Sequence, residues 1–288
     1  MKFGIVFANA GPSAGPEHAA GLARIAEESG FESLWTVEHV VVPAGYESPY
    51  PYSASGKMPG PEETPIPDPL IWLSYVAAVT RTIKLATGIL ILPQRNPVVL
   101  AKEAATLDVL SGGRFLLGIG VGWLREEFDC IGVPFSERGA RTDEYVAAMR
   151  SLWTEAEPTF DGRFASFAKA KSHPQPVQSG GVPIHVGGHT EAAARRAGRL
   201  GDGFFPANAG GPEEIAGLLE VMTRAAKEAG RDPSAIEITA GGAMDPDGAK
   251  RFADVGVDRL VIPPLGFDLD TLQRTLGEFG EKVIARVS

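Results

Sequence analysis

The stretch VVLAKEAATLDVLSGGRFLLGIGVGW, residues 98–123, contains one helix and the strand that follows it, and this pair of elements decides the fold. Val98–Leu110 has the apolar spacing of a helix, and Gly112 lies where a glycine often ends one. Phe115–Ile119 is a short apolar run, which predicts a buried strand. The stretch therefore predicts a helix packed against one strand of a parallel sheet.

The same pair of patterns recurs on both sides of this stretch. The predicted strands are Phe3–Phe7, Ser33–Val37, Ile83–Thr87, Phe115–Ile119, Val182–Val186, Gly203–Phe205, Ile236–Ala240 and Arg259–Ile262. The predicted helices are Glu17–Ser29, Pro69–Thr80, Val98–Leu110, Arg141–Trp153, Glu191–Leu200, Pro212–Ala229, Asp247–Val255 and Leu269–Phe279. Eight strand–helix units in 288 residues predict an α/β fold, a TIM (β/α)8 barrel formed by a single domain over residues 1–288.

Two long connections interrupt the alternation. Pro43–Pro69, after the second strand, holds eight of the chain's 23 prolines, so we expect an extended, Pro-rich insertion there. Pro158–Val182, before the fifth strand, contains Asp161–Gly162, a hairpin signal, and we expect it to cap one end of the barrel. Long connections in a compact fold are often functional, although the first could also be a surface excursion without a role.

The composition restricts the partners of the protein. Its 27 Lys and Arg against 36 Asp and Glu give a net charge of −9, which argues against nucleic acid or an anionic membrane as a partner. We find no apolar run long enough to span a bilayer and no signal-peptide pattern, so we expect a cytoplasmic protein. Cys130 is the only cysteine and is expected to be a packed thiol, and no residue spacing suggests a metal site.

In a parallel barrel the active site lies on the rim formed by the loops that follow the strands. Glycines collect on this rim, at Gly88, Gly120, Gly122, Gly187 and Gly188. Because glycine lets the backbone approach a ligand closely, the rim suits a flat ring with a phosphate tail. The alternative is that these turns need glycine whatever they bind. The helix that follows His189 could supply an anion site, or Thr190 could simply cap it.

One histidine lies where catalysis is expected. His39 directly follows the second predicted strand and stands beside Glu38. A histidine near a redox ring can move a proton, and a hydrogen-bonded structural histidine is the alternative. Trp123, in the fourth loop, could form a wall of a substrate pocket. The sequence contains no P-loop, HExxH or GxSxG motif, so phosphoryl transfer, zinc-protease chemistry and serine hydrolysis lack support.

Several of these stretches form the motifs of a known family. They are Ser33–Trp35 with Glu38 and His39, Thr87–Leu90, Pro93–Pro97, Ser111–Gly122, Glu137–Glu144, Val186–His189 and Arg199–Gly203. On these motifs, which extend over essentially the full length, the chain resembles the bacterial luciferase-like monooxygenase superfamily. Within it, the chain is most similar to the coenzyme F420-dependent oxidoreductase branch of actinobacteria. The motifs are specific for the superfamily and less specific for the cofactor.

The resemblance implies a TIM barrel whose rim binds a flavin-type ring. It implies a cis peptide bond between Gly88 and Ile89, which would press on one face of the ring. The cofactor-binding residues that it implies are Thr87, Gly88, Ile89, Gly120, Val121, Gly122, Gly187, Gly188 and His189. Branch members usually have Asp-His where this chain has Glu38-His39, so the contact of this acid with the ring is open.

The resemblance further implies an oxidoreductase that transfers a hydride between C5 of F420 and a small organic substrate. His39 and Glu38 are the expected catalytic residues, and Trp123, Tyr50 and Tyr52 are the expected substrate contacts. The alternatives are an FMN-dependent monooxygenase of the same superfamily and a barrel that binds a flavin without turnover. Relatives are often homodimers, and we expect a homodimer for this chain. Candidate cations for the acidic tail of F420 are Lys57, Arg95, Arg125, Lys169 and Lys171.

Overall fold

The computed structural model describes residues 1–207 and 210–287, and within them the chain forms the predicted closed barrel. Its eight parallel strands are β1 (Lys2–Val6), β2 (Ser33–Thr36), β3 (Lys84–Thr87), β5 (Phe115–Gly120), β8 (Ile184–Gly187), β9 (Gly203–Phe205), β10 (Glu237–Gly241) and β11 (Arg259–Ile262). Neighbours pair in the order β3-β2-β1-β11-β10-β9-β8-β5, and the pairing of β3 with β5 closes the ring. The TIM barrel is therefore confirmed.

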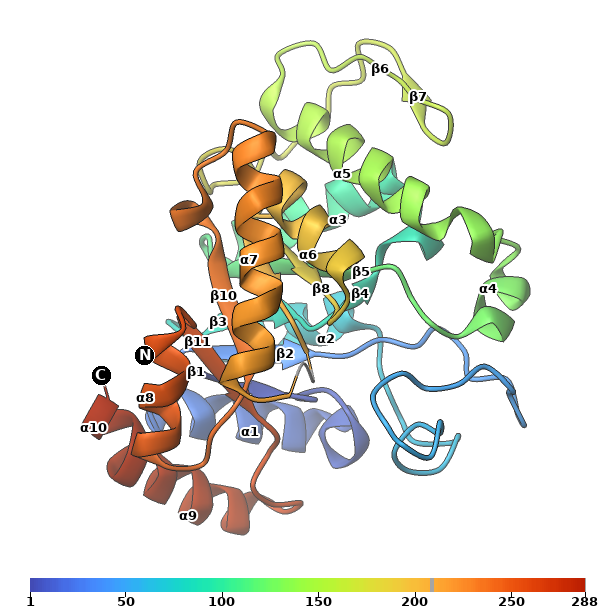
Figure 1. The fold of residues 1–288 in the computed structure, drawn as a ribbon. Coiled ribbons are helices and arrows are strands. Elements are labelled where there is room, and N and C mark those ends of the chain that lie inside the picture. The colour runs from blue at the N-terminus through green and yellow to red at the C-terminus, as the bar shows by residue number, and fades with distance from the viewer. Residues whose placement is uncertain (208–209, 288) are drawn as a thin grey trace.

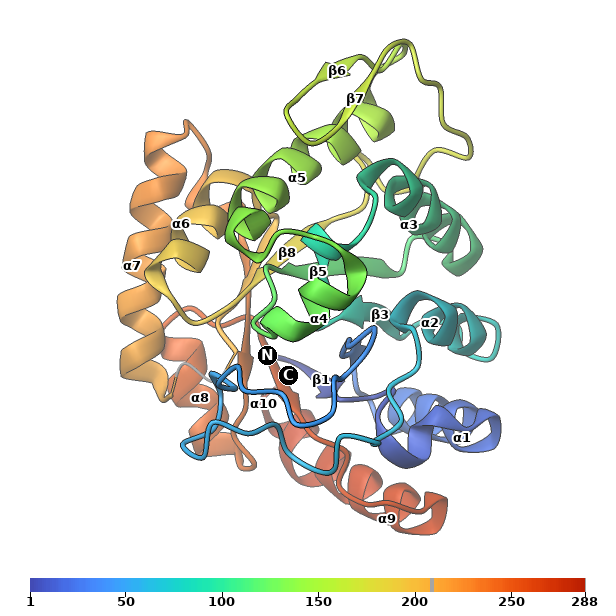
Figure 2. The same ribbon diagram turned by 90° about the vertical axis from the view of Figure 1, so that its right-hand side faces the viewer.

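Helices surround the barrel on all sides (Figures 1 and 2). They are α1 (Pro16–Glu28), α2 (Pro69–Ala77), α3 (Pro97–Ser111), α4 (Arg125–Ile131), α5 (Arg138–Thr154), α6 (Glu191–Leu200), α7 (Pro212–Glu228), α8 (Pro246–Asp254), α9 (Leu269–Phe279) and α10 (Ala285–Val287). Every predicted helix and strand of the barrel is found, with ends shifted by at most three residues. The short helices α4 and α10 were not predicted. Cys130 lies on α4 and is exposed, so the prediction of a packed thiol was wrong.

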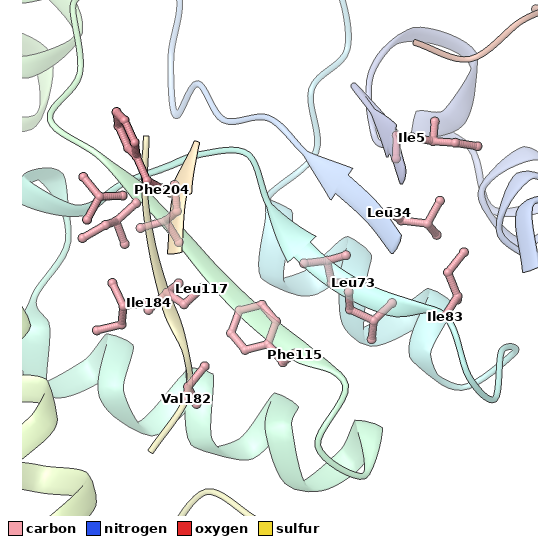
Figure 3. Close-up of a cluster of buried hydrophobic side chains, with 14 of the residues drawn as sticks. Ile5, Leu34, Leu73, Ile83, Phe115, Leu117, Val182, Ile184 and Phe204 are labelled. Carbon is pink, nitrogen blue, oxygen red and sulfur yellow. The ribbon is translucent and has the colours of Figure 1, made fainter. Parts of the chain in front are cut away.

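Side chains along the strands alternate between two hydrophobic layers. Leu34, Phe115 and Phe204 belong to a large cluster between the strands and the helices, where Leu73 of α2 joins them (Figure 3). The residues one position further along these strands belong to a smaller cluster inside the barrel, formed by Trp35, Ala86, Leu116, Phe205 and Val261. This period of two is the pattern expected for strands that are buried on both faces.

A buried ion-pair network closes the amino end of the barrel. The guanidinium of Arg259, the first residue of β11, donates to Glu32 at 2.7 and 2.9 Å and to Glu237 at 2.7 Å. Burial alone would raise the pKa of Glu237, but the charge of Arg259 lowers it to about 2. His185 lies 3.7 Å from the same carboxylate, and its burial lowers its pKa to about 4. Arg259, Glu32 and Glu237 partner one another at this end, which leaves the carboxyl end of the strands for a ligand.

The two insertions lie on different parts of the molecule. Residues 37–68 form no helix or strand and lie on the same side of the barrel as α4 (Figures 1 and 2). The predicted hairpin is formed by β6 (Phe160–Asp161) and β7 (Ser166–Phe167). It lies against α5, because the Glu144 carboxylate accepts the N–H groups of Phe164 and Ala165 at 2.6 and 2.8 Å. The hairpin therefore does not cap the barrel, whereas Gln178, later in the same segment, donates to the carbonyl oxygen of Phe115 at the amino end of β5 at 2.8 Å.

Candidate active site

The carboxyl end of β2 is fixed by one buried asparagine. Asn9, just beyond β1, donates from Nδ2 to the carbonyl oxygen of Val37 at 2.9 Å and accepts the N–H of Val37 at 2.8 Å. Its Nδ2 also donates to the carbonyl oxygen of Pro67 at 3.0 Å, at the far end of the Pro-rich insertion. One side chain thus holds both ends of residues 37–68 against the barrel and places Glu38 and His39 at its mouth.

Glu38 is held in an ion-pair cluster at this mouth. Its carboxylate, 2% exposed, accepts hydrogen bonds from Nε of Arg95 at 3.0 Å, from Nη2 of Arg95 and from the N–H of Ile91. Arg95 also donates to Asp68 at 2.7 Å. Burial raises the pKa of Glu38 despite the neighbouring guanidinium. For Asp68, burial is also the largest influence, but Arg95 and the N–H groups of Ile71 and Leu70 together lower its pKa. Both oxygens of Glu38 have partners, so its geometry favours anchoring Arg95 over proton transfer.

His39 has a different partner, which the sequence reasoning missed. Its Nδ1 lies 3.1 Å from Oε2 of Glu127 on α4, and the side chains of the two residues are 8% and 0% exposed. The other oxygen of Glu127 accepts the N–H of Val40 at 2.6 Å and that of Val41 at 3.4 Å. Glu127 therefore binds the ring of His39 and the backbone just beyond it at the same time.

The neighbouring carboxylate ties the Pro-rich insertion to the same helix. Glu126 accepts the N–H groups of Glu47 and Ser48 at 2.8 and 3.0 Å. Hydrogen bonds from the side chain and then the backbone of this turn lower the pKa of Glu126 to about 2. Within the insertion, the hydroxyl of Tyr46 accepts the N–H of Met58 at 2.8 Å, which braces its two halves. The insertion is thus an ordered wall beside His39.

Aromatic rings form a continuous row from His39 to His189. The ring of Trp123 makes edge contacts with His39 and Tyr50, at centroid distances of 5.7 and 5.1 Å. Tyr50 contacts Tyr52 at 5.3 Å, and Tyr52 contacts His189 at 5.0 Å. Burial, followed by the neighbouring tyrosines, raises the pKa of Tyr50 to about 12, so its hydroxyl stays protonated at neutral pH. The structure thus brings together all three expected substrate residues, the expected catalytic histidine and one expected cofactor residue.

The expected cis peptide bond is present between Gly88 and Ile89. It separates β3 from a second short strand, β4 (Leu90–Ile91), which also pairs with β5. Ala86 to Leu90 is four steps along the chain, whereas their partners Leu116 and Ile119 are three steps apart, so one extra residue bulges here.

Ile89 fills the space that two of the rim glycines leave. A Cβ atom added at Gly120 would lie 2.5 Å from Cδ1 of Ile89, and one added at Gly187 would lie 2.5 Å from Cγ2. At Gly122, where φ is +79°, a Cβ would lie 2.7 Å from the ring of Phe128 on α4. The simpler explanation of these glycines, close packing within the rim, therefore holds at all three positions, whatever the rim binds.

The remaining expected cofactor residues differ in burial and in whether their polar groups already have hydrogen-bond partners in the chain. Thr87 is fully buried and its hydroxyl donates to the carbonyl oxygen of Gly118 at 2.6 Å. The N–H of Gly188, where φ is +125°, donates to Phe205 at 3.0 Å, and Val121 is partly exposed. Thr190 does cap α6, since its hydroxyl accepts the N–H of Ala193 at 3.2 Å.

Besides Oε2 of Glu126 on α4, two buried polar groups at the mouth lack partners within the described residues. They are Nδ1 of His189, just after β8, and both amide atoms of Gln94, just after β4. Buried polar atoms in proteins are nearly always hydrogen-bonded, so unpaired ones at a barrel mouth call for a ligand or water. A flavin-type ring offers alternating carbonyl and N–H groups along one edge, and an amide can bond to both kinds. Sequence reasoning did not single out Gln94.

Most of the cations expected near an acidic tail have other partners. Lys57 donates to the carbonyl oxygen of Tyr46 at 2.6 Å, and Arg95 is shared by Glu38 and Asp68. The guanidinium of Arg125 lies over the ring of Phe135, and Nζ of Lys169 lies 4.0 Å from the carboxylate of Glu157. Lys171 lines a cavity of about 320 Å³ beside Trp153. This cavity lies at the last turn of α5, which returns to the amino end of the strands, so Lys171 is remote from the mouth.

Comparisons with known proteins agree with this geometry. The model of the luciferase-like monooxygenase family matches residues 1–244, and the chain therefore belongs to this family of oxidoreductases. An uncharacterized protein of Mycobacterium tuberculosis (strain ATCC 25618 / H37Rv) is 34% identical over 275 residues, which cover 92% of this chain and 94% of that protein.

Two further relatives carry functional names. The F420-dependent glucose-6-phosphate dehydrogenase of Kineococcus radiotolerans is 32% identical over 229 residues, which cover 78% of this chain and 62% of that protein. The crystal structure of the monooxygenase RslO1 from Streptomyces bottropensis superposes on the whole of both chains with a TM-score of 0.78 and 25% identity. Relatives of this chain thus include both an F420-dependent enzyme and a monooxygenase.

Within the described residues, no helix is long and apolar enough to cross a membrane, and no cluster of side chains could hold a metal ion.

Proposed function

We propose that the chain is an F420-dependent oxidoreductase that transfers a hydride between C5 of the deazaflavin and a small organic substrate. The observation that carries the proposal is the pairing of His39 with the buried carboxylate of Glu127 beside an aromatic wall at the barrel mouth. The F420-dependent relative supports the choice of cofactor.

The cofactor fits the groups that the mouth leaves free. Gln94 and His189 have buried polar atoms without partners in the described chain, and they would hold the ring and its phosphate-bearing side. Ile89, Val121 and Gly188 would border the ring. When bound, F420 supplies a carbon that gives or accepts a hydride, and the protein supplies position and proton transfer.

The substrate is expected to be uncharged. Glu38, Arg95 and Glu127 are each paired with another group of the chain, so none of the three offers a free charge to a substrate. The surface left for a substrate is the row formed by Trp123 and the tyrosines of the insertion, which suits an apolar or aromatic body carrying one alcohol or carbonyl group. His39 would take the proton of the alcohol, or return it to the carbonyl oxygen.

Titration of the purified chain with F420 and with FMN tests the cofactor. We expect tight binding of F420, weak binding of FMN, and turnover of simple alcohols or ketones with F420. The H39A variant should lower kcat by about 10²- to 10⁴-fold with little change in the Kd of F420. Unchanged turnover in H39A would leave the histidine with a structural role.

The second candidate is an FMN-dependent monooxygenase, which the likeness to RslO1 favours. Oxygen consumption with reduced FMN, together with weak F420 binding, would establish it instead. A barrel that binds a flavin without turnover would show binding of either cofactor and no reaction with any substrate.

We further propose a cytoplasmic homodimer that acts on a small molecule. The neighbouring helices α2 and α3 present an exposed apolar surface formed by Ile71, Tyr75, Val98, Val99 and Leu110. Ile71 and Leu110 are 73% and 70% exposed, which is high for large apolar side chains. A second copy of the chain would cover this surface.

A further inference from the structure

Within the described residues, the Glu127 carboxylate is the only hydrogen-bond partner of three groups at the mouth: the N–H groups of Val40 and Val41 and Nδ1 of His39. Oε1 accepts the N–H groups of Val40 and Val41, and Oε2 faces Nδ1 of His39 at 3.1 Å. The carboxylate is fully buried, so these contacts are not exchanged for water. Glu127 thus has a fixed orientation, set by two backbone groups that can only donate.

This orientation determines where the proton of His39 lies. The contact between Oε2 of Glu127 and Nδ1 of His39 is a hydrogen bond only if a proton lies between them, and a carboxylate that accepts two backbone N–H groups leaves that proton to the ring. It lies on Nδ1, where Oε2 of Glu127 accepts it. Nε2 receives no hydrogen bond from the described part of the chain and, in the neutral ring, carries a lone pair.

We propose that Glu127 is the positioning residue of this site: it fixes the proton of neutral His39 on Nδ1 and thereby makes Nε2 the acceptor for a substrate proton. The inference rests on the proposed function for its chemical consequence. In alcohol oxidation, the O–H bond breaks and its proton passes to Nε2, while the C–H bond breaks and its hydride passes to the oxidised deazaflavin. The products are a carbonyl compound, the reduced cofactor and a cationic His39 paired with Glu127.

The E127Q variant separates this role from simple packing. The N–H groups of Val40 and Val41 must keep an oxygen at the position of Oε1, so the amide nitrogen of the new side chain faces His39. That nitrogen donates, and Nδ1 must then accept, which moves the proton of the ring to Nε2. The variant therefore keeps the shape of the site and most of its hydrogen bonds, but it turns Nε2 from an acceptor into a donor.

The tautomer is read directly by ¹⁵N NMR of the full chain labelled at histidine, with the H39Q variant used to assign the signals. In a pH series raised until the ring signals of His39 stop shifting, we expect Nδ1 of the neutral ring to carry a proton in the wild type and Nε2 to carry it in E127Q. A bare Nδ1 in the wild type, or an unchanged tautomer in E127Q, would overturn the proposal. This measurement needs no cofactor, so it stands apart from any failure of the proposed function.

Kinetics give the second readout. With F420 and an alcohol, we expect kcat of E127Q to fall by about 10²- to 10⁴-fold while the Kd of F420 changes by less than about threefold. E144Q is the matched control, because Glu144 also accepts several backbone N–H groups but lies at the hairpin β6–β7 with no histidine partner. It should leave the tautomer and kcat unchanged. An equal loss of kcat in both variants would assign the effect to stability and refute the positioning role.

Discussion

The packing of Ile89 against the rim glycines makes a quantitative prediction that does not depend on any cofactor. In wild type, a methyl group at position 187 would lie 2.5 Å from Cγ2 of Ile89 and 3.3 Å from the carbonyl oxygen of Ile119. Cγ2 is bonded directly to Cβ and cannot swing away alone, so the backbone or the χ1 angle of Ile89 must change. Overpacking of this kind costs about 1–3 kcal/mol, and we expect G187A to destabilise the fold by that amount.

The I89A background should remove the penalty. Cβ of Ile89 lies 3.6 Å from the added methyl, an ordinary van der Waals distance, so I89A removes the severe conflict and leaves only the 3.3 Å approach to the carbonyl oxygen of Ile119. In I89A, the change of Gly187 to Ala should be neutral or stabilise by up to about 1 kcal/mol, because alanine restricts the unfolded chain more than glycine does. The coupling between the two substitutions should therefore be about 1–3 kcal/mol.

Urea unfolding of the wild type, both single variants and the double variant measures this coupling. The control is G217A in the middle of α7, where an added Cβ would have no neighbour within 4 Å. That change should stabilise the helix by about 1 kcal/mol in both backgrounds. If G187A costs the same with and without the Ile89 side chain, then packing against Ile89 is not the reason for a glycine at position 187.

Three further predictions concern other parts of the molecule. Burial lowers the pKa of His185 from 6.5 to about 4 in the folded state, so the unfolded state binds more protons between these two pH values. The free energy of unfolding should therefore fall by about 3 kcal/mol as the pH drops from 6.5 to 4. H185Q should flatten this slope in urea unfolding, and an unchanged slope in H185Q would assign it to other groups. I71E places a charge on the surface proposed for the dimer and should raise its dissociation constant at least about 100-fold in sedimentation experiments, unless the wild type is already a monomer. E38Q leaves Arg95 with a weaker partner and should destabilise the fold by about 1–3 kcal/mol, which lowers the thermal midpoint by several degrees. The tautomer of His39 should stay as in the wild type. A changed tautomer would show that Glu38 acts on the histidine.

The elements of the barrel could be predicted from the sequence because each strand and helix is defined by local periodicity and by residues at its ends. Asp68 and Asn96 cap α2 and α3 ahead of Pro69 and Pro97, and these signals are readable along the chain. The helix α4 escaped prediction because seven residues give little periodic signal and its acidic start reads as a solvated turn.

The partners within the site could not be predicted in this way. His39 and Glu127 are 88 residues apart, and Glu38 and Arg95 are 57 apart, so their pairing is decided by the closure of the barrel. Glu126 and Glu127 are identical in type and adjacent in sequence, yet one holds the insertion and the other is fully buried against the histidine. Only the tertiary fold distinguishes them. His39 and the rim glycines could be singled out because they directly follow predicted strands and recur in the family motifs, but neither signal names their partners.

The adjacent carboxylates of α4 also bear on how enzymes of this shape could exchange specificity. Residues 37–68 depend on Glu126 and Glu127 for the acceptors of four backbone N–H groups, at positions 40, 41, 47 and 48. A chimera that takes only this loop from a relative would leave those donors or the two carboxylates without hydrogen-bond partners. A chimera that takes the loop together with residues 123–132 would keep these hydrogen bonds. The two segments, distant in the sequence, therefore form one structural unit at the mouth of the barrel.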